Sequence, residues 1–315
     1  MTTPLLSLSN VHVRFNTAAG VVRAVNGVSL DLAVGETLGL VGESGCGKST
    51  LGKAIMRLVP VSAGEVRIDG VDIARLEGGK LTEMRRKVQM IFQDPYGSLN
   101  PRSTVGRSIA QPMVVAGWKQ EAIAERVDTL LRWVGLPTDA RQRYPHEFSG
   151  GQRQRIGIAR ALALSPKLII CDEPVSALDV SVRAQVINLL EDLKQQFGVS
   201  YLFISHDLSV VEHIADRVAV MYLGTIVEAG ARDQIWRRPQ HPYTKALLEA
   251  APIANPKLAR ARRRTVLQGE LPSPLAPPAG CPFHSRCPIA QERCTSDRPL
   301  LRPVGDGALA ACHFV

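Results

Sequence analysis

The stretch GESGCGKS, Gly42–Ser49, decides the fold of this 315-residue chain. It fits the pattern G-x-x-x-x-G-K-[ST], follows the apolar run ETLGLVG, and opens a helical pattern that we expect to continue to Pro60. In this context the pattern predicts a strand, a phosphate-binding loop and a helix. The glycines let the backbone approach phosphate oxygens, whose charge is stabilised by N–H groups at the helix N-terminus.

The side chains of this loop have separate expected roles. Lys48 is expected to reach the β- and γ-phosphates of a nucleotide, and the Ser49 hydroxyl to bind magnesium. Cys46 occupies a variable position of the pattern, so we assign it no redox role. The alternative interpretation is a glycine-rich turn that merely precedes a helix.

Apolar patterning around the loop predicts an α/β protein. We expect strands at 10–15, 24–32, 64–70, 167–173 and 200–206, an amphipathic helix at 180–197, and mostly helix over about 97–165. Strands that alternate with helices indicate a parallel sheet covered by helices. After residue 250 the chain becomes rich in proline and cysteine. We therefore predict a main domain over 1–250 and a C-terminal tail over 251–315.

Two acids end the buried strand KLIICDE. Carboxyl ends of parallel strands are where ligands bind in open α/β sheets. Asp172 is expected to hold magnesium through water, and Glu173 to orient or deprotonate the attacking water. Buried carboxylates would be costly without such a partner. Gln93, after the apolar run VQMIF, is a candidate contact to magnesium and the water, although a surface glutamine is the commoner case.

A second anion site is predicted at FSGGQRQRIGIARAL, residues 148–162. Ser149, Gly150 and Gly151 precede a helical pattern, so they leave a helix N-terminus free of bulky side chains. The first loop already holds one face of the nucleotide. The second site is therefore expected to act on the γ-phosphate bound by another copy, with two ATP molecules between two chains.

Bulk properties exclude some classes of protein. No apolar run is long enough for a membrane span, and the N-terminus lacks the pattern of a signal peptide. We therefore expect a cytosolic chain, in which disulfides are rare. The net charge is +9, with a basic run at 255–264. Such charge suits nucleic acid or an anionic membrane, but also an ordinary solvated linker.

Taken together, the motifs resemble the ATP-binding subunit of an ABC transporter. The resemblance covers about residues 5–230 and includes the phosphate loop, Gln93, the signature, the acidic strand, the SALD loop ending in Asp179, and His206 in ISHD. It implies an ABC-type P-loop ATPase fold, with a RecA-like core, an antiparallel β subdomain and a helical subdomain at about 97–165. A Cys/Pro-rich appendage follows the core.

The same resemblance implies roles for individual residues. Glu173 would be the catalytic base, His206 would hold the γ-phosphate, and Gln93 would link the site to the membrane subunits. Ser149 and Gly151 would act in trans, and Asp179 would lie at the contact between subunits. The expected nucleotide contacts are Phe15 (against adenine, or else a core residue), Gly42, Ser44, Gly45, Cys46, Gly47, Lys48, Ser49, Thr50, Gln93, Ser149, Gly150, Gly151, Gln152, Asp172, Asp179 and His206. The expected magnesium ligands are Ser49, Gln93 and Asp172.

Further stretches resemble the ATPase subunits of dipeptide and oligopeptide importers. These are VGESGCGKST, FQDPYGSLNPR, HPYTKALL and the cysteine-rich tail, so the match covers nearly the whole chain. It implies a peripheral subunit on the cytoplasmic face of the membrane. Its partners would be two membrane permeases, a second ATPase (itself or a homologue) and an extracytoplasmic substrate-binding protein, with no nucleic acid. Nickel, glutathione or sugar remain alternative cargoes.

Two other classes of protein stay open at this point. One is a soluble ABC ATPase that acts on ribosomes or DNA, although such proteins usually carry two cassettes, a coiled coil or a long insertion. The other is an iron–sulfur protein that binds nucleic acid, which would not need the signature or the switch histidine. Binding to DNA without ATP, weakened by salt, would favour it.

Four cysteines gather in the tail, at Cys281, Cys287, Cys294 and Cys312. Zinc sites favour the paired C-x₂₋₄-C spacing, which these residues lack. Four irregularly spaced thiolates suit an iron–sulfur cluster instead. Zinc and no metal at all remain alternatives, and the resemblance to peptide importers implies a [4Fe–4S] cluster. The expected role is structural, because metal–sulfur bonds would hold together a proline-rich segment with little apolar content.

Overall fold

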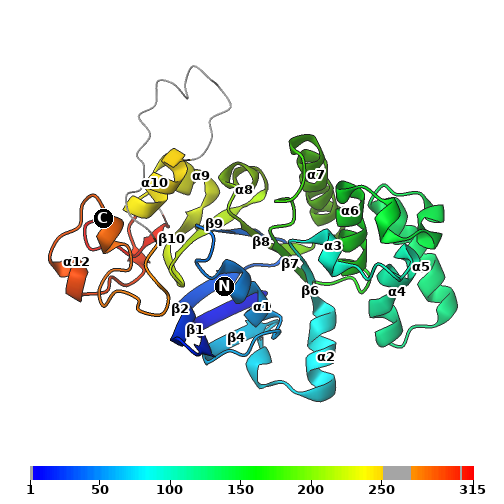
Figure 1. Cartoon of the computed structure of the whole chain (residues 1–315), viewed down its shortest axis with the longest axis horizontal. Coiled ribbons are helices and arrows are strands. Elements are labelled where there is room, and N and C mark those ends of the chain that lie inside the picture. Colours follow the sequence, from blue (N-terminus) through cyan, green and yellow to red (C-terminus); the bar gives the residue numbers. More distant parts are fainter. Residues whose placement is uncertain (1–2, 251–270, 306) are drawn as a thin grey trace. The chain divides into compact units, whose positions relative to one another are not determined.

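A computed structural model describes residues 3–250, 271–305 and 307–315 (Figure 1). The basic run at 255–264 lies outside these residues. The described chain forms two compact units. The first unit takes the described residues of 1–32, 36–74 and 205–315, and the second takes 33–35 and 75–204.

An antiparallel sheet of the first unit has the strand order β2-β1-β4-β5. Its strands are β1 (Leu6–Thr17), β2 (Gly20–Leu32), β4 (Ala63–Ile68) and β5 (Val71–Asp72). Along β1, buried Val11 and Val13 alternate with more exposed neighbours. This period of two is the half-buried strand predicted at 10–15. The sheet supplies the antiparallel β subdomain expected for the fold.

A second set of strands in the first unit runs in the order β11-β12-β10-β9-β3. Their bounds are β3 (Thr37–Val41), β9 (Arg217–Tyr222), β10 (Thr225–Ala231), β11 (Arg302–Pro303) and β12 (Leu309–Ala310). β3 and β9 are parallel, and every residue of β3 is buried. The antiparallel hairpin of β9 and β10 was not predicted from the sequence.

Helices of the first unit follow these strands in the chain. They are α1 (Lys48–Ile55), α8 (Leu208–Ile214), α9 (Arg232–Arg237) and α10 (Pro242–Ala250). α1 begins at the predicted residue but ends five residues before Pro60. The helix stops early because Arg57 adopts a left-handed backbone conformation, with φ of 50°.

The second unit contains three parallel strands in the order β8-β7-β6. They are β6 (Val88–Ile91), β7 (Leu168–Asp172) and β8 (Ser200–Ser205). The central strand β7 is buried throughout, as the continuous apolar run KLIICDE predicts. α7 (Val180–Phe197) follows it and buries Val186, Ile187, Leu190 and Leu193 on one face.

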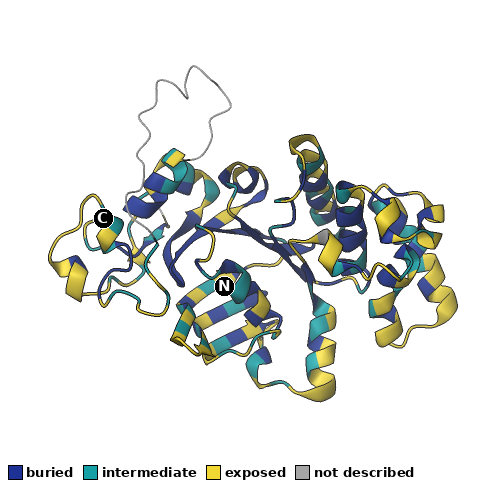
Figure 2. Cartoon of the chain, in the orientation of Figure 1, coloured by how far each residue is buried: buried dark blue, intermediate teal, exposed yellow. Residues whose placement is uncertain are grey.

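The segment at about 97–165, predicted to be mostly helical, is mostly helical in the structure. It contains α3 (Pro95–Ser98), α4 (Val105–Val115), α5 (Gln120–Trp133) and α6 (Gly150–Ala161), with 3-10 turns at Thr138–Gln142 and Pro145–Glu147. A further helix, α2 (Gly78–Lys87), was not predicted. Exposed residues run along α2 and α5, whereas β7, β8 and β9 are largely buried (Figure 2). In the described part of the chain, no helix has the length and apolar character of a membrane span.

The described part of the tail consists mainly of loops, and one aromatic side chain anchors it. Its regular elements are short: a 3-10 turn at His284–Arg286, α12 (Arg293–Ser296), β11 and β12. Phe283 is 1% exposed and packs its ring against Tyr222 and Tyr243. β12 pairs with β10. These contacts bury apolar surface, so the described tail packs within the first unit; a domain boundary near residue 250 stays a prediction.

Candidate nucleotide site

The phosphate loop joins β3 to α1 with a backbone that only glycine tolerates. Gly42 and Gly47 have φ of 153° and 107°. A Cβ atom at Gly42 would overlap the carbonyl oxygen of Met221, and one at Gly47 would overlap that of Ala24. These two segments of the same chain approach the loop so closely that only glycine fits at positions 42 and 47.

Lys48 ties the two ends of this loop together. Its side chain is buried, and its Nζ donates hydrogen bonds to the carbonyl oxygens of Gly42 (2.8 Å) and Glu43 (2.9 Å). The ammonium group is thus placed inside the curve of the loop. Cys46 lies beside it, and burial raises the pKa of the Cys46 thiol. A neutral, buried thiol fits a packing role.

In the second unit, Gln93 and Glu173 come together from positions 80 residues apart. Gln93 follows β6, and its Nε2 donates to Glu173 Oε2 at 2.9 Å. Glu173 directly follows β7 and has φ of 47°, a left-handed conformation that is costly for a residue with a side chain. Its N–H donates to the Ile204 carbonyl at 2.9 Å, which holds that conformation in place. Asp172, the last residue of β7, is 4% exposed.

The signature begins α6 with a reciprocal cap. Ser149 Oγ accepts from the Gln152 N–H at 3.3 Å, and Gln152 Oε1 accepts from the Ser149 N–H at 3.0 Å. Both side chains are exposed, so this helix N-terminus faces solvent. Gly151 is buried against α7, where a Cβ atom would overlap Val182. Packing of α6 on α7 is therefore enough to require glycine at 151.

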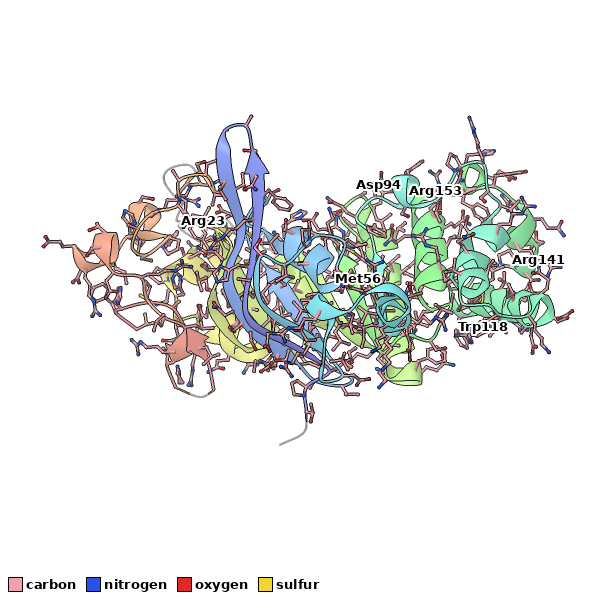
Figure 3. The ribbon with its side chains drawn as sticks, turned by 90° about the horizontal axis from the view of Figure 1, so that it is seen from below. Arg23, Met56, Asp94, Trp118, Arg141 and Arg153 are labelled. Carbon is pink, nitrogen blue, oxygen red and sulfur yellow. The ribbon has the colours of Figure 1, made fainter. Side chains whose placement is uncertain are left out.

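Arg153 links the signature to the loop after Gln93. Its guanidinium donates to the carbonyl oxygen of Phe148 and lies over the Tyr96 ring, 3.6 Å from the ring centre. Figure 3 shows Arg153 close to Asp94, whose side chain caps α3 by accepting from the Tyr96 N–H. The contact between Arg153 and the Tyr96 ring was not predicted, because an arginine inside a helical pattern gives no sign of its partner.

The remaining predicted residues lie on separate elements. Phe15 is half-buried near the end of β1. Asp179 is the exposed N-cap residue of α7, and His206 is exposed directly after β8. Their predicted roles toward a nucleotide stay predictions, as do those of Ser44, Gly45, Ser49, Thr50 and Gly150.

The four tail cysteines lie at least partly out of solvent. Cys281, Cys294 and Cys312 are buried and Cys287 is half-buried. The pKa of Cys281 is raised to about 11, first by burial and then by the neighbouring thiols of the other three. Yet within the ranges that the structure describes, no group of three or more His, Cys, Asp or Glu residues has the placement of a metal site. The geometry thus gives no support to the predicted iron–sulfur cluster.

Comparison with known proteins gives two family matches. The family described as "ABC transporter" matches residues 25–176, and the "Oligopeptide/dipeptide transporter, C-terminal region" matches residues 227–294. The second match begins in β10 and ends at Cys294.

Similar proteins extend along nearly the whole chain. It is 55% identical over 300 residues to a probable peptide ABC transporter ATP-binding protein, y4tS, of Sinorhizobium fredii, covering 95% of this chain and 84% of the relative. It is 52% identical over 308 residues to the oligopeptide transport ATP-binding protein OppF of Salmonella typhimurium, covering 94% and 92%.

Solved structures show the same fold. A dimeric ATP-binding cassette in a post-hydrolysis state with ADP and phosphate superposes with a TM-score of 0.66 and 29% identity, over 72% of this chain and 98% of that one. The cbiO1 protein of Clostridium perfringens, part of an ABC transporter complex, superposes with a TM-score of 0.67 and 26% sequence identity. The match covers 75% of this chain and 92% of that one. The predicted ABC ATPase fold is confirmed.

Proposed function

The chain belongs to the peptide-transporter branch of the ABC ATP-binding subunits, and from this premise we propose that it hydrolyses ATP to drive the import of di- and oligopeptides. The observation that carries the proposal is the identity of 50% or more with peptide-transport ATPases along almost the full length. The match to the oligopeptide/dipeptide transporter C-terminal region favours peptides over nickel, glutathione or sugar. It also favours an importer over a soluble ABC ATPase of ribosomes or DNA.

Nucleotide binding follows from the chemistry of the loop. Its backbone N–H groups and the N-terminus of α1 suit the negative charge of a triphosphate. Lys48, already placed inside the loop, would pair with the β- and γ-phosphates. Phe15 would stack on adenine. Ser49, Gln93 and Asp172 carry the hydroxyl, amide and carboxylate oxygens that magnesium prefers, and the bound ion would neutralise charge on the phosphates.

Hydrolysis would use Glu173 as the base. Its carboxylate takes a proton from the attacking water, while the oxygen of that water forms a bond to the γ-phosphorus and the bond to ADP breaks. The strained backbone of Glu173 and its hydrogen bond from Gln93 support this role, because both fix the direction of the carboxylate. His206 would hold the γ-phosphate as it leaves.

The second half of each site would come from another ATPase subunit. The exposed, capped N-terminus of α6, with Ser149–Gln152, suits the γ-phosphate held by a partner, and Asp179 would contact that partner. A related cassette was solved as a dimer with ADP and phosphate. We place the pair on the cytoplasmic face of the membrane, bound to two permease subunits that receive peptide from an extracytoplasmic binding protein.

The function is tested in proteoliposomes that contain the two permeases and the ATPase pair. Adding binding protein loaded with a tripeptide is expected to raise ATP hydrolysis several-fold and to move the peptide across the membrane. Stimulation by binding protein loaded with nickel or glutathione, and not by peptide, would assign another cargo. Full ATPase activity of the dilute, isolated protomer would contradict the shared site.

A second proposal concerns the four cysteines of the tail. We propose that Cys281, Cys287, Cys294 and Cys312 hold a [4Fe–4S] cluster, and the irregular spacing of these four cysteines in the sequence is what supports the proposal. Such a cluster would supply structural bonds and no step of hydrolysis.

Protein purified without oxygen is expected to be brown and to contain about four iron atoms per chain. Cys294→Ser should lose the colour, whereas Cys46→Ser, outside the tail, should keep it. Colourless protein with stoichiometric zinc, or without metal, would contradict the cluster and leave the ATPase function untouched.

A further inference from the structure

We propose that Arg286, in the cysteine-rich tail, is a positioning residue of the phosphate loop, which it holds through Glu43 and thereby sets the affinity for ATP. The inference rests on the proposed function, because it concerns the same nucleotide site. It assigns the tail a direct connection to ATP binding. The contact joins residues 243 positions apart in the sequence, and both belong to the first unit.

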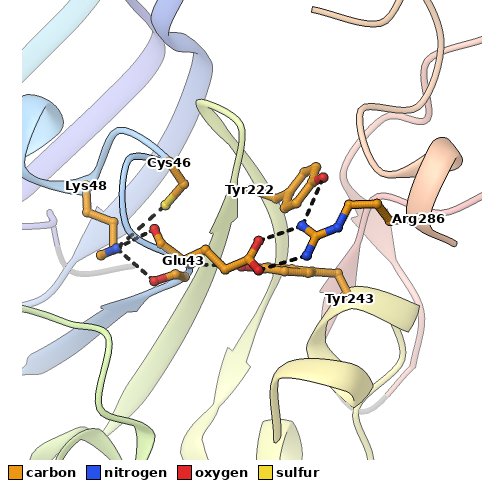
Figure 4. A network of polar contacts seen from close by, with 7 residues as sticks. Glu43, Cys46, Lys48, Tyr222, Tyr243 and Arg286 are labelled. Atoms are coloured by element: carbon orange, nitrogen blue, oxygen red, sulfur yellow. Dashed lines mark hydrogen bonds and ion pairs between the residues drawn. The ribbon is translucent and has the colours of Figure 1, made fainter. Parts of the chain in front are cut away.

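The ion pair has the geometry of a fixed contact. Arg286 Nη1 donates to Glu43 Oε2 at 2.7 Å, and Nη2 donates to Oε1 at 2.9 Å (Figure 4). The Arg286 side chain is 6% exposed and that of Glu43 is 29% exposed. Two parallel bonds between planar groups restrict both side chains more than a single contact would. The hydrogen bonds with Glu43 also raise the pKa of the Arg286 guanidinium, so it stays charged.

Glu43 is also held through its backbone groups. Its N–H donates to the Tyr243 hydroxyl at 2.9 Å, and its carbonyl oxygen accepts from Lys48 Nζ at 2.9 Å and from the Cys46 N–H at 3.3 Å. Figure 4 shows Glu43 between Lys48 on one side and Arg286 on the other. A shift of Glu43 would therefore move the carbonyl that orients the lysine expected to bind phosphate.

The tail fixes Arg286 independently of the loop. Arg286 ends the 3-10 turn at His284–Arg286, and its own N–H donates to the Phe283 carbonyl at 3.0 Å. Phe283 is buried among aromatic rings, and the Cys281 N–H donates to the Cys294 carbonyl at 2.8 Å. Arg286 therefore reaches the loop from a segment that its own packing and backbone bonds restrain.

Charge adds to the geometric effect. Glu43 places a carboxylate on the loop that is to bind a triphosphate, and an unpaired carboxylate there would repel it. Arg286 neutralises that charge. Because the guanidinium is buried, removal of Glu43 would leave a buried charge without its counterion, which is more costly than removal of one partner of an exposed pair.

The test compares ATP affinity in the full-length protein by equilibrium titration. Arg286→Gln is expected to raise the Kd for ATP about tenfold, and Arg286→Lys, which keeps the charge but not the paired bonds, about threefold. Arg293→Gln is the matched control, since Arg293 lies in the same tail segment but pairs with Asp297 on the surface. It should bind ATP as the wild type does.

A double-mutant cycle separates positioning from general loss of stability. Glu43→Gln combined with Arg286→Gln should weaken ATP binding no more than Arg286→Gln alone, whereas Glu43→Gln and Arg293→Gln should combine additively. Should Arg286→Gln fail to fold, Arg286→Lys replaces it in the cycle. Wild-type affinity in the folded Arg286 and Glu43 variants, or additive effects, would overturn the proposal. If the wild-type chain itself binds no ATP, the proposed function fails instead.

Discussion

Replacing Glu173 by glutamine is expected to leave ATP binding intact and to reduce the rate of ATP hydrolysis by a factor of about 10²–10⁴, the usual contribution of a general base. Glutamine keeps the size of the side chain and its ability to hydrogen-bond to Gln93, but it takes no proton from water. The backbone conformation of Glu173 depends on its N–H bond to Ile204, which the substitution leaves in place.

The loss should appear in kcat, with the KM for ATP changed little, because the removed interaction acts only in the transition state. The closed pair with two ATP molecules should accumulate, which gel filtration with ATP would reveal as a dimer. Glu125→Gln, an exposed change on α5, serves as the control. Vigorous hydrolysis by the Glu173 variant would reject Glu173 as the base.

Replacing Lys48 by alanine is expected to raise the Kd for ATP by about 10²-fold or more, since a charge-assisted contact to two phosphates is lost in a buried setting. The loop carbonyls of Gly42 and Glu43 lose their shared donor at the same time. The loop should therefore also lose its restraint, and hydrolysis should fall with binding. Isothermal titration with ATP and magnesium measures the effect.

Lys53→Ala is the matched control, because Lys53 lies exposed in the last turn of the same helix. It should bind ATP with wild-type affinity. Thermal unfolding shows whether the Lys48 variant is folded. Unchanged ATP affinity in a folded Lys48→Ala protein would refute the phosphate-loop assignment.

Much of the fold could be predicted because local patterns determined it. The glycine loop between a buried strand and a helix is recognised from neighbouring residues, and the apolar run at 167–173 has the length of an interior strand. The hairpin of β9 and β10 was missed because the buried strand β10, with the sequence TIVEAGA, contains Glu228 and Gly230. Its sequence is therefore not the continuous apolar run that marked β7 and β8. α2 was missed because it buries only Met84, so its apolar face gives little periodic signal.

The sequence by itself determined the family and the fold, and it predicted the residues that carry the chemistry, because these depend on residue types at short, fixed spacings. Only the tertiary structure decided which distant residues meet. It set Gln93 against Glu173, required glycine at 47 to clear Ala24, and joined Arg286 to Glu43. The physical reason is that a hydrogen bond or a steric clash depends on distance in space. No local sequence pattern carries the distance between residues that are 80 or 243 positions apart.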